Sequence, residues 1–184
     1  MNKFEERTLK TKQIFDGKII SLQVDDVKLP NGAVSQREIV NHPGAVAIIP
    51  VTKDDKIIFV EQYRKPLERS IIEIPAGKIE PNEHPKITAR RELEEETGYT
   101  TKNLQHVTSF YTSPGFANEL IHIYYTNELY PLEAKVSGDE DEFVEVFELT
   151  LPEAEQYIDE QKIYDAKTIY AITHLKLLRM NESC

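Results

Sequence analysis

Apolar residues along this chain gather in short runs of the length of β-strands, with turn-forming residues between them. The run 45–51 is apolar throughout, which is typical of a strand buried on both faces. Ile20, Leu22 and Val24 instead alternate with polar residues, as in a strand with one buried face. The pattern predicts strands at 20–24, 35–40, 45–51, 57–63, 71–74, 104–112, 120–126 and 143–149.

Two segments near the C-terminus have the pattern of helices. Thr150 and Glu153 are spaced as a capping box that opens a helix. A second helix is predicted from about residue 166 to residue 180, because apolar residues recur there at helical spacing. The stripe that we expect to pack into the core consists of Ile169, Ile172, Leu175 and Leu178.

Short strands with a few helices among them predict an α/β protein, in which helices cover both faces of a mixed sheet. We expect the strands of residues 1–43 to form a small antiparallel sheet, and residues 44–184 to form the main domain. A chain of 184 residues has the length of one domain with a small addition. It can bury a core without disulfides or structural zinc.

The segment 77–99 holds a dense run of carboxylates between two residues that delimit a helix. Pro85 suits the first helical turn, and Gly98 suits the left-handed residue just past a helix end. A helix of about 20 Å is therefore predicted over 85–97. Ala89 and Leu93 lie four residues apart and share its apolar side.

Three glutamates of this predicted helix have an unfavourable arrangement unless a cation is present. Glu92, Glu95 and Glu96 are three and four residues apart, so their carboxylates converge on one side and repel. They also lie at the negative end of the helix dipole, where cations are favoured. A hard divalent ion that takes oxygen ligands, such as Mg²⁺, resolves both problems. The alternative is a solvated acidic face with 91–95 and 90–94 arginine–glutamate pairs.

The spacing of the segment decides between these alternatives. It fits the pattern G-x5-E-x7-R-E-U-x-E-E-x-G-U, in which U is a bulky aliphatic residue. Through this pattern the chain resembles the Nudix hydrolases, enzymes that cleave a nucleoside diphosphate linked to another group. Tyr99 departs from the pattern as an aromatic residue at an aliphatic position. The matching residues are Gly77, Glu83, Arg91, Glu92, Leu93, Glu95, Glu96 and Gly98.

The composition limits the cellular location and the binding partners that are expected for this protein. The net charge of −10 opposes binding to nucleic acid, because such binding depends on lysine and arginine at the phosphates. The single cysteine, Cys184, allows no intrachain disulfide and no cysteine–zinc cluster. The charged start of the chain is not a signal peptide, and no apolar run has the length of a membrane span. A soluble cytoplasmic protein that binds no membrane is expected.

The resemblance implies which residues carry the chemistry. The metal, Mg²⁺ with Mn²⁺ as the alternative, would be held by Glu92, Glu95, Glu96 and the carbonyl of Ala76. Arg91 would orient the glutamates and counts, with Glu95, among the catalytic groups.

A second acidic run, 138–142, is in isolation typical of a solvated loop. In the resembling enzymes that cleave ADP-ribose, a loop glutamate acts as general base and a neighbour reaches the metal. Both Glu140 and Glu142 fit, with Glu142 favoured near the metal and Glu140 as the base. Glu83 fits a catalytic role and a helix-stabilising role equally well.

The substrate is indicated by residues outside the motif. Pro114 and Glu119 lie at positions where ADP-ribose pyrophosphatases of this family carry a proline and a glutamate. Arg64 ends a predicted strand and is suited to a forked bond with phosphate. For any one of these residues the alternative is a surface salt bridge. The predicted substrate-binding residues are Arg37, Glu38, Arg64, Lys78, Ser113, Pro114, Gly115 and Glu119.

The resemblance implies a metal-dependent pyrophosphatase that converts ADP-ribose, a small-molecule nucleoside diphosphate sugar, to AMP and ribose 5-phosphate. It also implies a homodimer with exchanged N-terminal segments. One rival is a Nudix hydrolase of a nucleotide sugar or an oxidised nucleotide. Another is a non-catalytic module that senses ADP-ribose, and the intact motif argues against it. A calcium-buffering protein would leave Gly77, Arg91 and Gly98 unexplained.

Overall fold

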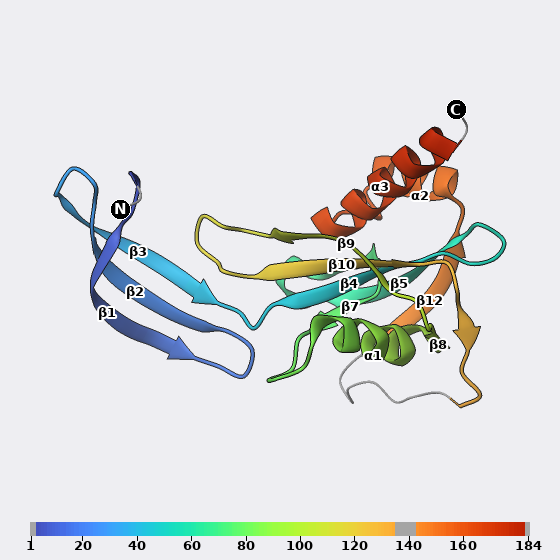
Figure 1. The fold of residues 1–184 in the computed structure, drawn as a ribbon, viewed down its shortest axis with the longest axis horizontal. Helices are drawn as coiled ribbons and strands as arrows, with labels where there is room; N and C mark the ends of the chain where they lie inside the picture. The colour runs from blue at the N-terminus through green and yellow to red at the C-terminus, as the bar shows by residue number, and fades with distance from the viewer. Residues whose placement is uncertain (1–2, 135–142, 183–184) are drawn as a thin grey trace. The chain divides into compact units, whose positions relative to one another are not determined.

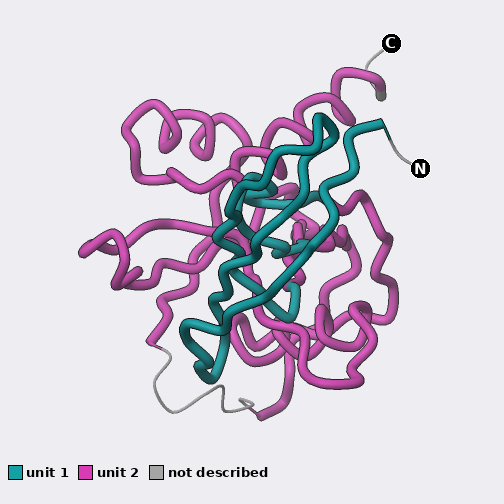
Figure 2. The backbone as a smooth tube through the Cα atoms, turned by 90° about the vertical axis from the view of Figure 1, so that its left-hand side faces the viewer, with its two compact units in different colours: residues 1–44, 110–121 teal, residues 45–109, 122–184 magenta. Residues whose placement is uncertain are grey.

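The computed structural model describes residues 3–134 and 143–182, which fold into two compact units (Figures 1 and 2). Unit 1 comprises residues 1–44 and 110–121, and unit 2 comprises residues 45–109 and 122–184. The described elements are β1 Arg7–Asp16, β2 Ser21–Lys28, β3 Val34–Asn41, β4 Ala45–Pro50, β5 Ile57–Arg64, η1 Lys65–Leu67, β6 Arg69–Glu73, β7 Ala76–Lys78, α1 Pro85–Thr97, β8 Tyr99–Thr100, β9 Gln105–Tyr111, β10 Leu120–Thr126, β11 Tyr130–Pro131, β12 Val144–Leu149, α2 Leu151–Asp159 and α3 Ala166–Glu182.

Unit 1 is built on an antiparallel sheet of three strands in the order β1-β2-β3. The predicted strands at 20–24 and 35–40 are confirmed as β2 and β3. The turn between them uses Gly32 at φ +86°, a left-handed conformation that suits glycine. The 110–121 segment joins this unit through Asn118, whose amide nitrogen donates to Asn41 at 3.0 Å.

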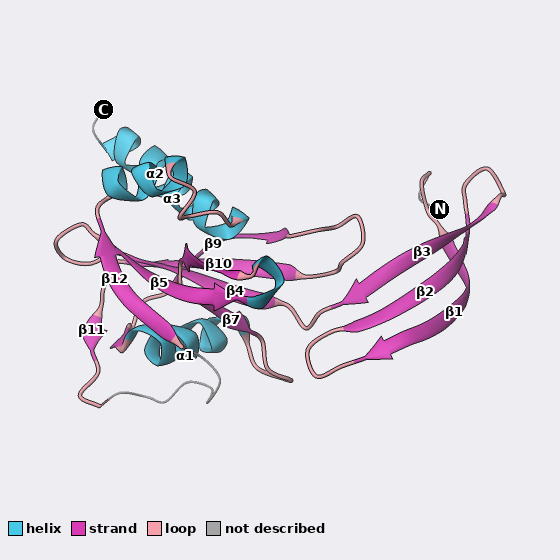
Figure 3. Cartoon of the chain, turned by 180° about the vertical axis from the view of Figure 1, so that it is seen from behind, coloured by secondary structure: helices cyan, strands magenta, loops and turns pink. Residues whose placement is uncertain are grey.

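Unit 2 contains two larger sheets, with helices on both sides of them (Figures 1 and 3). The strand orders are β7-β4-β10-β9 and β12-β5-β6, and β11 and β8 form a small pair. Helix α1 lies on one side, whereas α2 and α3 lie on the other. Strand β4 is buried at every residue, as its apolar run predicts. The predicted α/β class is thereby confirmed.

The C-terminal helix corrects one prediction. Ile172 and Leu175 of α3 are buried, but Ile169 and Leu178 are 37% and 38% exposed. A step of three residues falls about 60° short of a full helical turn, so four such positions drift halfway around the helix. Only the middle two residues of the expected stripe are buried, and Lys167, Thr168 and Ala171 complete the buried side of α3.

Local signals predicted element ends well. The capping box is present, because Thr150 accepts from the backbone of Glu153 and Glu153 accepts from the backbone of Thr150. The short strands β7, β8 and β11 were not predicted, since two or three residues carry no periodicity. Within the part of the chain that the structure describes, no helix is both long and apolar enough to cross a membrane.

Candidate active site

Helix α1 begins and ends where the sequence predicts. Pro85 occupies the first turn, and the ring nitrogen of His84 accepts from the backbone N–H of Lys86, which caps the helix start. Gly98 ends the helix at φ +73°. Ala89 and Leu93 are fully buried, so the apolar side of α1 anchors the helix on the sheet. The acidic side is thereby held in place against β7.

Glu92 and Glu96 are buried carboxylates that both face β7. They are 6% and 5% exposed, which is unusual for charged residues. Glu96 Oε2 accepts from the backbone N–H of Ala76 at 2.9 Å. The carboxylate of Glu92 lies so close to Gly77 that a Cβ at that position would overlap it. Glycine is therefore required at 77 by close approach.

Arg91 links the glutamates of the motif. Its Nη1 lies 2.8 Å from Glu92 and 2.9 Å from Glu95, and its Nη2 lies 3.2 Å from Glu83. Burial lowers the pKa of Arg91, but hydrogen bonds to Glu83 and Glu95 and the charge of Glu92 outweigh burial and raise it. The guanidinium stays charged and contacts three of the acidic groups. We name Arg91 with Glu83, Glu92, Glu95 and Glu96 the Arg91 cluster.

The donor chemistry of this cluster fits a hard divalent cation. Its oxygens are carboxylates in excess over cations, and Gly77 opens the backbone toward Glu92. In the described residues, no three acidic, histidine or cysteine side chains are arranged to hold a metal ion. Arg91 contacts one oxygen of Glu92 and one oxygen of Glu95, so a metal ion at this site would share these carboxylates with Arg91.

Glu83 lies near the start of α1 and serves the cluster. It accepts from Arg91 and from the hydroxyl of Thr88, at 2.9 Å for the latter. The bond from Arg91 is the main reason that the pKa of Glu83 lies below its usual value. Of the solvated-face pairs, 91–95 is present. Glu94 accepts from the Thr100 hydroxyl.

Arg64 lies in the same unit as α1 and has a buried acidic partner. Its Nε donates to Glu73 Oε2 at 2.6 Å, and Glu73 is 2% exposed. Burial lowers the pKa of Arg64, but the bond to Glu73 and the charges of Glu73, Glu96 and Asp165 raise it overall. The influence of Glu96 puts Arg64 within electrostatic reach of the Arg91 cluster.

The other predicted substrate residues divide between the two units. Lys78 lies on β7, where its carbonyl accepts from Arg91 at 3.3 Å. Arg37 of β3 forms a 2.6 Å ion pair with Glu6, and Glu38 follows on the opposite face of the strand. The remaining residues, Ser113, Pro114, Gly115 and Glu119, belong to unit 1. There Glu119 accepts from the hydroxyl of Thr112. Glu140 and Glu142 lie outside the described residues.

Three charged residues linked to Arg64 were not among the predicted site residues, namely Glu73, Lys167 and Asp165. Lys167 of α3 forms ion pairs with Glu73 and, at 2.9 Å, with Asp165. The available signal was Glu73 itself, a lone carboxylate among Ile71, Ile72 and Ile74 in a strand with the composition of a core. Such a position predicts a buried partner, because an unpaired buried charge is very costly. The sequence does not say which cation supplies it.

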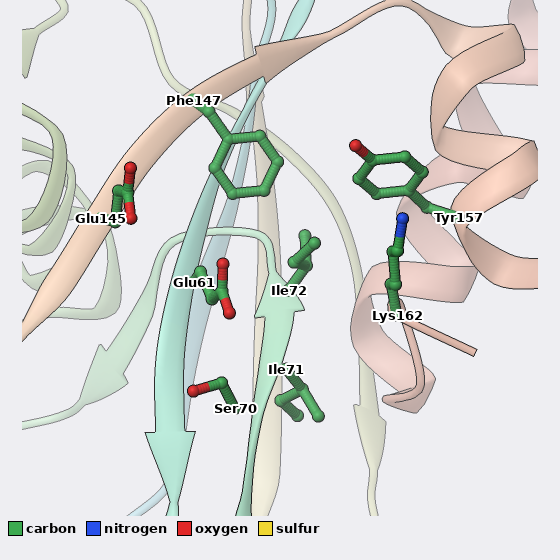
Figure 4. A pocket seen from close by; sticks show the side chains of 8 residues that line it. All are labelled: Glu61, Ser70, Ile71, Ile72, Glu145, Phe147, Tyr157 and Lys162. Atoms are coloured by element: carbon green, nitrogen blue, oxygen red, sulfur yellow. The ribbon is translucent and has the colours of Figure 1, made fainter. Parts of the chain in front are cut away.

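A separate cavity of about 390 Å³ lies on the sheet β12-β5-β6 (Figure 4). Glu61 and Glu145 are directly opposite each other across β5 and β12, and the Lys162 amine lies over the Tyr157 ring at 4.4 Å. No predicted site residue lines this cavity. Its lining residues are Glu61, Ser70, Ile71, Ile72, Glu145, Phe147, Tyr157 and Lys162.

Comparison with known proteins shows the family to which the chain is similar. Residues 41–170 match the NUDIX domain, and residues 6–40 match the nucleoside diphosphate sugar hydrolase N-terminal domain. A methanol dehydrogenase activator of Bacillus methanolicus is 60% identical over 95% of this chain and 94% of its own. An ADP-ribose pyrophosphatase of Bacillus subtilis is 59% identical over 96% of both chains.

A solved structure described as an ADP compounds hydrolase shares the fold. Its TM-score is 0.85 at 21% identity, over 97% of this chain and 96% of that chain. The fold, the NUDIX match and the two relatives agree with the motif on α1, and they confirm the resemblance read from it. The chain belongs to the Nudix hydrolase family.

Proposed function

We propose that this protein hydrolyses the pyrophosphate of ADP-ribose to AMP and ribose 5-phosphate with Mg²⁺ as its metal. The observation that carries the substrate is the 59% identity to an ADP-ribose pyrophosphatase over 96% of both chains. The Arg91 cluster supports the reaction type, because Nudix hydrolases generally need divalent metal ions. Mn²⁺ is the alternative metal.

The side chains of the cluster have distinct tasks in this proposal. Glu92, Glu95, Glu96 and the Ala76 carbonyl would hold the metal, which supplies charge neutralisation at the phosphoryl oxygens. Arg91 holds Glu92 and Glu95 in a common orientation, as their distances of 2.8 and 2.9 Å indicate. Glu140 is proposed as the base that takes the proton of the attacking water, and Glu142 as its neighbour near the metal.

Arg64 is the proposed phosphate ligand. Among the described residues, its Nε donates to Glu73, and no hydrogen bond or ion pair of its two terminal nitrogens is found. The side chain is 38% exposed, so these nitrogens are available to a ligand. Two parallel N–H groups match two oxygens of a phosphate. Lys78 is proposed as a second substrate contact.

We propose that residues 1–43 form the dimer through exchange, and that residues 44–184 form the catalytic domain. The large apolar side chains on β1 support this, because Leu9, Ile14 and Phe15 are 48%, 48% and 55% exposed. Arg37, Glu38 and the 113–119 segment are then proposed to contact the substrate of a neighbouring subunit. A cytoplasmic location is part of the proposal, since the substrate is a metabolic nucleotide.

A product assay tests the proposal. The chain is incubated with ADP-ribose, a nucleotide sugar and an oxidised nucleotide, each with Mg²⁺ and with EDTA. We expect AMP and ribose 5-phosphate from ADP-ribose, a loss of about a hundredfold or more in EDTA, and recovery with excess Mg²⁺. Turnover that EDTA does not reduce would refute the metal mechanism. Binding of ADP-ribose without AMP release would favour a sensing module.

A second candidate function follows from the relative that is 60% identical. That protein is described as a methanol dehydrogenase activator, and it matches 95% of this chain. We propose that this chain also raises the rate of an alcohol dehydrogenase. Dehydrogenase turnover is measured with and without the chain, and with a Glu96→Gln variant. Activation by the variant would separate this role from hydrolysis, and absence of activation by the native chain would reject it.

A further inference from the structure

Four charged residues in unit 2 form a connected network beside Arg64. Arg64 donates to Glu73, Glu73 pairs with Lys167, and Lys167 pairs with Asp165. The network contains two cations and two carboxylates, so its formal charge is zero. The side chains of Glu73 and Lys167 are 3% and 10% exposed, whereas that of Arg64 is 38% exposed. The side chain of Asp165 is 18% exposed, so the arginine end is the most open to solvent. We name these residues the Glu73 network.

Glu73 is shared between two cations. One of its oxygens accepts from Arg64 at 2.6 Å and the other accepts from Lys167. A carboxylate that serves Arg64 alone would neutralise it more fully in a buried setting. Because the Glu73 carboxylate also pairs with Lys167, it neutralises less of the Arg64 charge. More positive potential therefore remains at Arg64 to attract an anionic ligand. The shared carboxylate also fixes the Nε of Arg64, and among the described residues no hydrogen bond or ion pair of the two terminal nitrogens is found.

Lys167 is held firmly by the start of α3. Asp165 accepts from the backbone N–H of Thr168 at 3.2 Å, which is a helix cap, and accepts from Lys167 with the same oxygen. The hydroxyl of Thr168 accepts from the backbone N–H of Ile74 at 3.0 Å. Thr168 is fully buried. Consecutive residues of α3 therefore clamp Glu73 and Ile74, which lead into Ala76 of the proposed metal site.

From this geometry we infer that Lys167 is a positioning residue for pyrophosphate binding. Through Glu73 it orients the Arg64 guanidinium and limits its neutralisation, without touching the substrate itself. The inference rests on the proposed function, because it assigns Arg64 to the phosphate. A purely architectural role for the network would lower stability but would not alter substrate affinity. The two roles are therefore separable by experiment.

The test compares Lys167→Met with the native chain in AMP release from ADP-ribose. We expect KM to rise about tenfold, the effect of weakening one hydrogen bond to a charged group. We expect kcat to change by about twofold or less, because the chemistry lies at the Arg91 cluster. Lys167→Arg keeps the charge and should restore most of the affinity. Lys176→Met is the matched control, since Lys176 lies on the same helix in an exposed pair with Glu155.

A double variant decides whether Lys167 acts through Arg64. Arg64→Ala alone should raise KM at least as much as Lys167→Met. In the Arg64→Ala background, Lys167→Met should add little, because the group that it positions is gone. Additive effects of the two changes would overturn the inference. A normal KM for Lys167→Met would overturn it as well.

Folding and substrate identity are controlled separately. Lys167→Gln keeps donors for Glu73 without the charge, so it replaces the methionine variant if that one unfolds, and its KM should rise too. If neither variant folds, the network is a folding element and the inference is wrong. If the native chain cleaves another nucleoside diphosphate and not ADP-ribose, the proposed function fails. The same comparison is then made with that substrate, where Arg64 faces the same pyrophosphate.

Discussion

The two arginine-centred groups of unit 2 differ in charge balance. Arg91 is paired with Glu83, Glu92 and Glu95, and Glu96 lies beside them on the same helix. That cluster has one cation for several carboxylates. In the Glu73 network, two cations meet two carboxylates. Each group has a partly exposed arginine and mostly buried carboxylates, so solvent exposure does not account for the difference.

The difference separates a group whose charge favours an added ion from a group whose charges balance. Excess buried negative charge is unstable unless it is protonated or neutralised by a cation. The Arg91 cluster therefore favours a divalent metal, whereas the charges of the Glu73 network balance among its own residues. Removal of the Glu96 charge should therefore relieve repulsion in the cluster, whereas removal of a charge from the Glu73 network should unbalance it and lower stability.

The largest expected effect comes from removing one carboxylate of the Arg91 cluster. Glu96→Gln should lower kcat about a thousandfold or more, because a proposed metal ligand is lost. The fold should be kept, since the glutamine oxygen can still accept from the Ala76 N–H. The Tm should be unchanged or higher, because a repelling charge is gone. AMP release and thermal unfolding measure both effects.

Glu94→Gln is the control for that change. Glu94 lies on the same helix, but it accepts from the Thr100 hydroxyl and is not a proposed ligand. We expect nearly native turnover. Retained AMP release by Glu96→Gln, or an equal loss in both variants, would contradict the assignment of the cluster.

A smaller effect is expected from adding one methyl group opposite Glu92. In Gly77→Ala the new Cβ would overlap the Glu92 carboxylate, which must move. A displacement of about 1 Å can cost about a hundredfold in rate, and kcat should fall by that order. Gly98→Ala is the comparison, because nothing lies near its Cβ and only its left-handed backbone is strained. It should lower Tm with little loss of kcat. Equal losses of kcat would show that the helix end, and not Glu92, is responsible.

Most of the fold could be predicted because its signals are local. The ends of α1 follow from Pro85 and Gly98, and the buried strand β4 follows from its apolar run. Pairing between distant segments could not be predicted in this way. The 110–121 segment joins the N-terminal strands through contacts such as that of Asn118 with Asn41. No periodicity within either segment records that contact.

The two charged groups show the same limit at the level of the site. The Arg91 cluster lies within one short segment, from Glu83 just before α1 to Glu96 in its last turn, so its spacing is visible along the chain. The Glu73 network joins β5, β6 and the start of α3, and Glu73 and Lys167 are 94 residues apart. The sequence showed a lone glutamate among isoleucines but not its partner. Which cation neutralises a buried carboxylate is decided by tertiary packing.

The smallest expected effect comes from Glu83, at the edge of the Arg91 cluster, whose contribution to stability depends on pH. The pKa of Glu83 is lowered in the folded protein, mainly by the hydrogen bond from Arg91. Its contribution to stability is therefore complete above the pKa of an unfolded glutamate, about 4.3, and is lost as pH falls through the folded value. Glu83→Gln should lower Tm by about 2 °C at pH 7, and the two Tm curves should converge in acid. Glu148→Gln removes an exposed pair with Lys56 and is the control. A constant Tm difference from pH 7 to pH 3 would mean that Glu83 acts by packing rather than by charge.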